Sequence, residues 1–223
     1  MIDISSVKIK TPSSNCLTPY SPKSNELLNL LSFTRLAKIW LMVAAVTQTT
    51  MRAVVRHATP EDIPAIVNFN KIARTSMFPM LDSTSHNEQA ERELATFQQI
   101  YLEHPDGAFL TARIDGVLVA TIGYVPYDHR FPQLQLGQKR VVEVVRLYVD
   151  PALRRTGLAS RLFADLEMTA RQKGIEQLYL HTHPFLPGAI NFWGKRGFST
   201  LHLDQDPVWR TVHMRLFLDG GEC

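Results

Sequence analysis

The stretch from Val141 to Ala159, VVEVVRLYVDPALRRTGLA, constrains the fold more than any other part of the chain. A run of β-branched apolar residues ends at Asp150-Pro151, and the sequence then opens through Gly157 into a helix-forming segment. The first N–H groups of a helix have no partner within the helix and lie at the positive end of its dipole. A strand that leads into such a turn can hold a diphosphate, and glycine lets the phosphate approach the backbone closely. The sequence therefore predicts an anion-binding turn between a strand and a helix.

The spacing Arg-x-x-Gly-x-Ala after Leu-Tyr-Val-Asp-Pro resembles the acetyl-CoA-binding motif of the GNAT superfamily of N-acetyltransferases. Four further blocks occur in the order of that family and resemble its first strand and helix, its second and third strands, its fifth strand, and the helix that follows. These blocks are residues 51–70, 107–127, 178–183 and 189–198. The resemblance implies one α/β domain over residues 51–218. Its expected fold is a mixed, mostly antiparallel sheet flanked by helices and splayed between strands four and five.

The resemblance also implies where acetyl-CoA, the co-substrate, binds. Its pantetheine arm is expected to pair with the backbone of the fourth strand, and its pyrophosphate to meet the N–H groups of the turn, with added charge from Arg154 and Arg155. The alternative is an ordinary strand-to-helix turn with a solvated arginine pair. The residues expected to bind acetyl-CoA are Leu147, Tyr148, Val149, Arg154, Arg155, Thr156, Gly157, Leu158, Ala159 and Phe192.

Glu143 is the candidate catalytic residue. It lies four residues before Leu147, where many GNAT enzymes carry a glutamate that accepts the proton of the acceptor ammonium group. A charged residue inside a valine-rich strand is costly to bury unless the site is polar, which indicates that Glu143 faces a cleft. The alternative is a structural glutamate paired with Arg146 or His181.

The helix block departs from the family pattern at the general acid. Trp193 stands where the family often has a tyrosine that protonates the leaving thiolate, and an indole N–H is not acidic enough for that role. Leu186 replaces a frequent asparagine. The thiolate then leaves unassisted or is protonated by water, or Tyr148, His181 or His183 contributes.

The function that follows is direct transfer of an acetyl group from acetyl-CoA to a primary amine. A small-molecule acceptor is favoured, because no segment indicates a peptide groove. The loop at residues 75–86 is expected to shape the acceptor site, and residues 127–140 form either a substrate lid or a solvated hairpin loop. The rivals are an acyltransferase with another acyl chain or acceptor, and a catalytically weak acyl-CoA-binding regulatory module, which the missing tyrosine suggests.

Charge and cysteine content narrow the partners and the location. Residues 51–223 carry nineteen basic and nineteen acidic side chains, so no basic face for nucleic acid is expected, and the net charge of +3 arises within residues 1–50. The two cysteines, Cys16 and Cys223, cannot staple a core, which favours a reducing cytoplasm. His181 and His183 alternate on one strand face and indicate a polar face rather than a metal site. The oligomeric state stays open, a homodimer included.

The first fifty residues lie outside the expected domain. Residues 1–25 have a disordered composition, and residues 26–46 are apolar and prone to form a helix. Arg35 and Lys38 interrupt that run, which argues against a membrane-spanning helix. A secretory signal and a translation start at Met51 are the two other interpretations, and the second is preferred. Residues 219–223 are expected to form a short tail.

Overall fold

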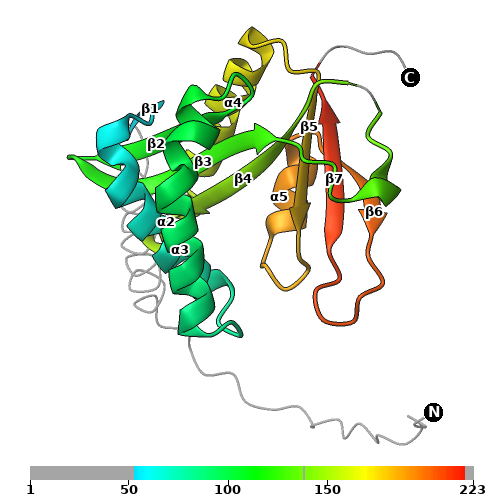
Figure 1. Ribbon diagram of the computed structural model, residues 1–223, viewed down its shortest axis with the longest axis horizontal. Coiled ribbons are helices and arrows are strands. Elements are labelled where there is room, and N and C mark those ends of the chain that lie inside the picture. Colours follow the sequence, from blue (N-terminus) through cyan, green and yellow to red (C-terminus); the bar gives the residue numbers. More distant parts are fainter. Residues whose placement is uncertain (1–52, 138, 219–223) are drawn as a thin grey trace, which may run out of the picture. The chain divides into compact units, whose positions relative to one another are not determined.

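The computed structural model describes residues 53–137 and 139–218, so the expectations for residues 1–50 and 219–223 lie outside the described residues. The described part forms a seven-stranded sheet in the order β1-β2-β3-β4-β5-β7-β6 (Figure 1). Only β4 and β5 are parallel neighbours; the other pairs are antiparallel. The expected mixed, mostly antiparallel sheet is thus confirmed. The strands are β1 (Val54–His57), β2 (Ala108–Ile114), β3 (Val117–Pro126), β4 (Val141–Val149), β5 (Gln177–Thr182), β6 (Ser199–Leu203) and β7 (Val212–Phe217).

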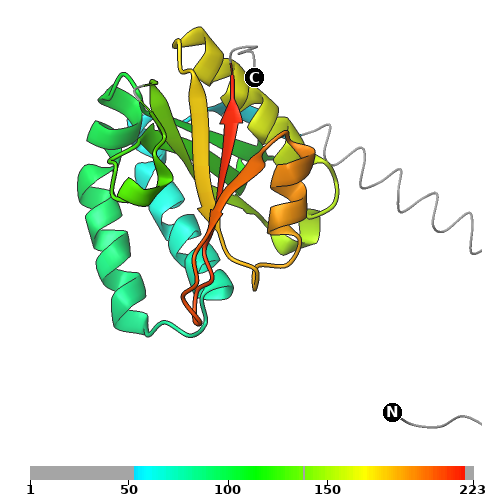
Figure 2. The same cartoon turned by 90° about the vertical axis from the view of Figure 1, so that its right-hand side faces the viewer.

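Helices cover both faces of the sheet. Helices α2 (Ile63–Met77) and α3 (Ser83–Phe97) lie on one face, and α4 (Leu158–Gln172) and α5 (Ala189–Lys195) lie on the other (Figure 2). Adjacent residues of β2 show the consequence: Phe109 packs into the core under α2, and Leu110 packs into the core under α4. Short helical turns make up the rest, at Pro60–Asp62, Gln98–Glu103, Pro132–Leu134 and Pro151–Leu153. None of the helices in the described part is long and apolar enough to cross a membrane.

Strands β4 and β5 separate soon after they begin. Their pairing joins Val141, Val142 and Glu143 to Gln177, Leu178 and Tyr179 and then ends, although β4 continues to Val149 and β5 to Thr182. Beyond Glu143, the backbone edge of β4 that faces β5 is therefore open to an extended ligand. The splay that the family resemblance implied is confirmed.

A β-bulge interrupts β4 inside this splay. Thr121 of β3 pairs with Tyr148, but Gly123 pairs with Val145, so two residues of β4 lie opposite the single residue between them. The first of the two, Arg146, has a left-handed backbone with φ of 59°. The bulge bends β4 and changes the direction of its backbone groups at the centre of the splay.

The structure corrects the expectation for the loop at residues 75–86 and adds detail to the loop at residues 127–140. Helix α2 continues to Met77 and α3 begins at Ser83, so the loop at residues 75–86 shrinks to residues 78–82. Helix α3 starts at Ser83 because Asp82 caps it: the Asp82 side chain accepts the N–H of Ser85 at 2.7 Å. In the second loop, Tyr127 and Leu134 pack with Tyr179 in a small cluster, so this segment folds back on the sheet.

Candidate active site

A cavity of about 810 Å³ follows the splay. Residues of β4 from Val144 to Val149 form one wall, and the end of β5 with the start of α5 forms the other. It is also lined by Arg155 and Ala159, near the N-terminus of α4, and by side chains of α2 and α3. These helices cover opposite faces of the sheet (Figure 2). Because residues from both faces line the cavity, it passes through the sheet where β4 and β5 part.

The structure brings most of the expected cofactor residues to this cavity. Those that line it are Leu147, Tyr148, Val149, Arg154, Arg155, Ala159 and Phe192. Thr156, Gly157 and Leu158 do not line it. The Thr156 hydroxyl donates to the Leu153 carbonyl at 2.7 Å, and the Leu158 side chain, 1% exposed, packs in the core. Only the backbone of these three residues is therefore available to a ligand.

The turn before α4 keeps the geometry of an anion site. Gly157 caps the fifteen-residue helix with φ of 91°, and Arg155 is also left-handed with φ of 66°. A Cβ atom added at Gly157 would meet no atom within 4 Å, so space is open beside the backbone. The Arg154 guanidinium lies 5.4 Å from the centre of the Tyr148 ring and donates to the Val149 carbonyl at 3.3 Å. A phosphate fits here, with free helix N–H groups and two arginines beside it.

Glu143 is buried behind the cavity wall rather than exposed on it. Its side chain is 2% exposed, and its Oε1 atom accepts hydrogen bonds from His181 Nδ1 at 2.8 Å and Arg130 Nη2 at 2.6 Å. Burial raises the pKa of the Glu143 carboxyl group, but the bonds to His181 and Arg130 outweigh burial and hold this pKa below its ordinary value. His181 itself lines the cavity. Glu143 is thus linked to the cavity by its hydrogen bond to His181.

His181 at the end of β5 and His183 just after it both line the cavity, whereas their alternation predicted only a polar strand face. An ionised carboxylate only accepts hydrogen bonds, so His181 donates through Nδ1 to Glu143 and keeps a lone pair on Nε2. His183 lies in hydrogen-bond reach of the Trp209 carbonyl, 3.2 Å from Nδ1, and the same reasoning applies. Burial lowers the pKa of His183 despite this hydrogen bond. Both imidazoles can accept a proton through Nε2.

Trp193 of α5 stands where the family often has a tyrosine. Trp193 is buried at the cavity wall, and its ring packs edge-on against Phe163 at 5.6 Å and Phe198 at 5.3 Å. Leu186 also lines the cavity. The position of the frequent tyrosine is thus filled by a core residue.

Sequence reasoning missed several polar residues on α2 and α3 that line the cavity: Asn70, Arg74, His86 and Glu93. Glu93 Oε1 accepts from Asn70 Nδ2 and from Arg146 Nε, each at 2.9 Å. The signal was present as polar residues at helical spacing, four apart on α2 and seven apart on α3, within otherwise buried stripes. It is weak, because exposed polar residues follow the same spacing.

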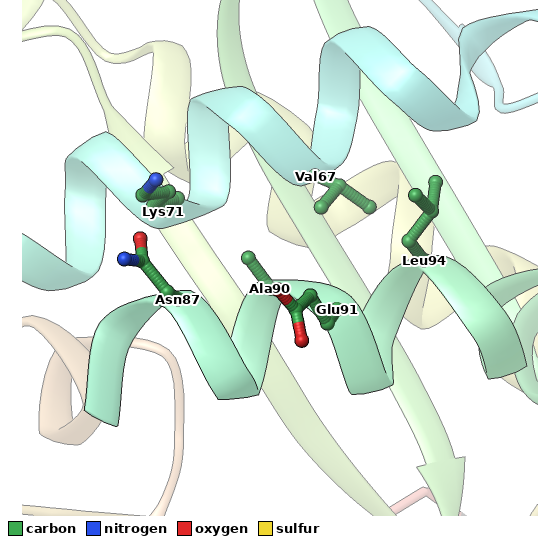
Figure 3. Close-up of a pocket in the computed structure, with 6 residues that line it drawn as sticks. All are labelled: Val67, Lys71, Asn87, Ala90, Glu91 and Leu94. Carbon is green, nitrogen blue, oxygen red and sulfur yellow. The ribbon is translucent and has the colours of Figure 1, made fainter. Parts of the chain in front are cut away.

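A second, open groove of about 370 Å³ lies along the seam between α2 and α3, with Lys71 and Asn87 at one end and Val67 and Leu94 at the other (Figure 3). None of the expected cofactor residues lines it. Within residues 53–137 and 139–218, no group of three or more His, Cys, Asp and Glu side chains is placed to hold a metal ion.

The splayed sheet, the anion turn and the through-going cavity are the features of an acyltransferase that binds its acyl donor along a strand edge. The sequence model described as the acetyltransferase (GNAT) family matches residues 72–198, more than half of the chain. The chain belongs to the GNAT family.

Individual proteins agree with this assignment. The uncharacterized N-acetyltransferase YjgM of Escherichia coli K12 is 29% identical over 151 residues, which cover 68% of this chain and 83% of YjgM. The uncharacterized N-acetyltransferase Rv2669 of Mycobacterium tuberculosis H37Rv is 34% identical over 99 residues, 44% of this chain and 57% of Rv2669.

Solved structures share the fold at low sequence identity. A GNAT-family acetyltransferase from Staphylococcus aureus Mu50 has a TM-score of 0.59 and 18% identity, covering 74% of this chain and 99% of that one. The PaiA N-acetyltransferase of Thermoplasma acidophilum, solved in complex with coenzyme A, has a TM-score of 0.56 and 16% identity, covering 74% and 98%.

Proposed function

We propose that this protein transfers the acetyl group of acetyl-CoA directly to the primary amine of a small molecule. The observation that carries the proposal is the cavity that joins the anion turn before α4, the open edge of β4 and the space between α2, α3 and β5. A diphosphate at the turn and an amide chain along β4 would bring a thioester to the bulge. The acceptor would enter from the α2 and α3 side.

His181 acts as the general base in this proposal, and Glu143 is a positioning residue. The Glu143 carboxylate fixes the imidazole tautomer and stabilises the charge that forms when Nε2 takes a proton from the acceptor ammonium group. The freed amine attacks the thioester carbonyl carbon, the carbon–nitrogen bond forms and the carbon–sulfur bond breaks. The attacking nitrogen loses a second proton, which passes through water to the CoA thiolate, and His181 releases the first proton to solvent. The products are an amide, CoA and one released proton.

Calorimetric titration of acetyl-CoA into the full chain tests the proposal. We expect binding to the unmodified protein and a loss of affinity of at least about 100-fold in Gly157→Glu, because bulk and negative charge then fill the turn. Gly116→Glu is the matched control. It places the same side chain at another positive-φ glycine with open space around it, in the hairpin turn away from the cavity.

The outcomes separate the rival functions. Absence of binding to the unmodified protein would reject the proposal, and equal loss in both variants would show that the turn is not the site. Binding without acetylation of any amine would favour the regulatory module, for which Trp193 at the tyrosine position is the motivating observation. Tighter binding of a longer acyl-CoA would favour another acyl chain.

A further inference from the structure

Arg74 brings a positive charge to the acceptor end of the cavity. The Arg74 guanidinium lines the cavity, and within the described part of the chain it makes no side-chain hydrogen bond or ion pair. Burial lowers the pKa of Arg74, and the charges of Arg146 and Arg92 lower it further, more than Glu93 offsets. A half-buried arginine in this situation is stabilised by an anion.

Glu93, the carboxylate whose charge acts on Arg74, already bonds two other side chains. Glu93, 7% exposed, binds Asn70 and Arg146 through one oxygen. It is also the only carboxylate that lines the cavity in the described part of the chain, against the cations Lys71, Arg74 and Arg146 at this end. The acceptor end therefore carries excess positive charge, which disfavours a polycationic acceptor and favours one with a negative group.

A second observation comes from His86 of α3. Its side chain is 3% exposed and lines the cavity, yet among residues 53–137 and 139–218 neither ring nitrogen has a hydrogen-bond partner. Buried imidazole nitrogens are normally satisfied, so an unpaired one beside a cavity indicates a missing polar ligand. Arg74 and His86 together provide donors for an anionic group.

The same end of the cavity has an apolar wall. Phe78, His183 and Trp209 line it and form ring contacts with one another at 5.4 to 6.2 Å between centroids. Met77, Leu81 and Leu186 add to the apolar surface. These side chains would contact the apolar part of an acceptor.

We infer that the acceptor is a free amino acid with an apolar side chain, whose carboxylate binds Arg74 and whose side chain contacts Phe78 and Trp209. The inference rests on the proposed acetyl transfer and names its substrate class. It excludes amines that carry a second positive charge.

Steady-state acetylation of matched acceptor pairs tests the inference. The pairs are L-phenylalanine with L-phenylalaninol, L-leucine with L-leucinol, and L-methionine with L-methioninol, in which the alcohol keeps the amine and side chain but lacks the carboxylate. We expect kcat/KM to be at least about tenfold higher for the amino acid of at least one pair. No preference in any pair, including no turnover of either member, would overturn the inference. The acetyl-CoA titration decides separately whether the proposed function stands.

A variant assigns the preference to Arg74. Arg74→Gln should raise KM for the amino acid at least about tenfold, leave the alcohol within about twofold, and leave the affinity for acetyl-CoA unchanged, which shows that the variant is folded. Lys195→Gln is the control, because Lys195 is exposed on α5 and does not line the cavity. An unchanged preference in Arg74→Gln, or an equal loss in Lys195→Gln, would contradict the assignment.

Discussion

In the proposed mechanism, His181 and Glu143 each supply one of two properties that a general base needs. His181 lines the cavity and presents Nε2, whereas Glu143 supplies negative charge from a buried position. The Arg130 guanidinium also donates a hydrogen bond to Glu143 Oε1, which helps to fix the carboxylate. Neither residue alone explains proton transfer as well as the pair does.

The pair predicts different effects for its two members. His181→Gln should lower kcat about 100-fold, the usual size of a lost general base. Glu143→Gln should lower kcat less, because an amide oxygen still accepts the Nδ1 hydrogen bond but does not offset the charge of the imidazolium that forms. Steady-state kcat values of the two variants check both. A larger loss in Glu143→Gln than in His181→Gln would instead assign the base to Glu143.

At the scale of elements, the bulge of β4 depends on the helices above it. Arg146 occupies a left-handed conformation that costs about 1 kcal/mol or more in a non-glycine residue. Its side chain is held by Glu93 of α3, and its carbonyl accepts from the Thr121 hydroxyl of β3 at 2.9 Å. The shape of the splay is thus coupled to α3.

This coupling predicts the effect of Glu93→Ala. The free energy of unfolding should fall by about 2 to 3 kcal/mol, because Arg146 and Asn70 lose their buried partner. The acetyl-transfer rate should fall with it, since the bulge is no longer fixed. Glu91→Ala, an exposed carboxylate on the same helix, should change stability by less than about 0.5 kcal/mol. Urea titration checks both variants, and similar losses in the two would refute the coupling.

At the scale of the whole molecule, the sequence predicted what local patterns encode. The strand, glycine turn and helix of residues 141–159 are such a pattern: β4 ends at Val149, Gly157 has a φ of 91°, and α4 begins at Leu158. The pairing of Glu143 with His181 was one of the alternatives that the sequence left open. The bulge at Arg146 was not predictable, because it depends on contacts with Glu93 of α3 and Thr121 of β3, 53 and 25 positions away.

The end of the cavity where the acceptor is proposed to bind was even less predictable from local sequence patterns. It assembles Arg74 of α2, His86 of α3 and Trp209 of the segment before β7, which no motif connects. Phe78 and Leu81 of the predicted loop at residues 75–86 line the cavity, although α2 and α3 leave only residues 78–82 to the loop. Its neighbouring helix surfaces, rather than the loop itself, supply most of the charge.

Buried histidines predict how the stability of the whole molecule depends on pH. His213 is 0% exposed and lies between Tyr179 and Asp204, and burial lowers its pKa although Asp204 partly offsets this; the pKa of His183 is also lowered by burial. A histidine with a lowered folded-state pKa takes up a proton on unfolding, so its stabilising effect is present above pH 6.5 and is lost as the pH falls towards the folded-state pKa.

We therefore expect the free energy of unfolding to fall between pH 7 and pH 5, by up to about 1.4 kcal/mol per pH unit for each proton taken up. Urea titrations at pH 7, 6 and 5 measure this slope. His213→Gln should reduce it, because the variant removes one of the groups that take up a proton on unfolding. A slope that is unaffected by His213→Gln would mean that His213 is already protonated in the folded protein, with its charge held by Asp204.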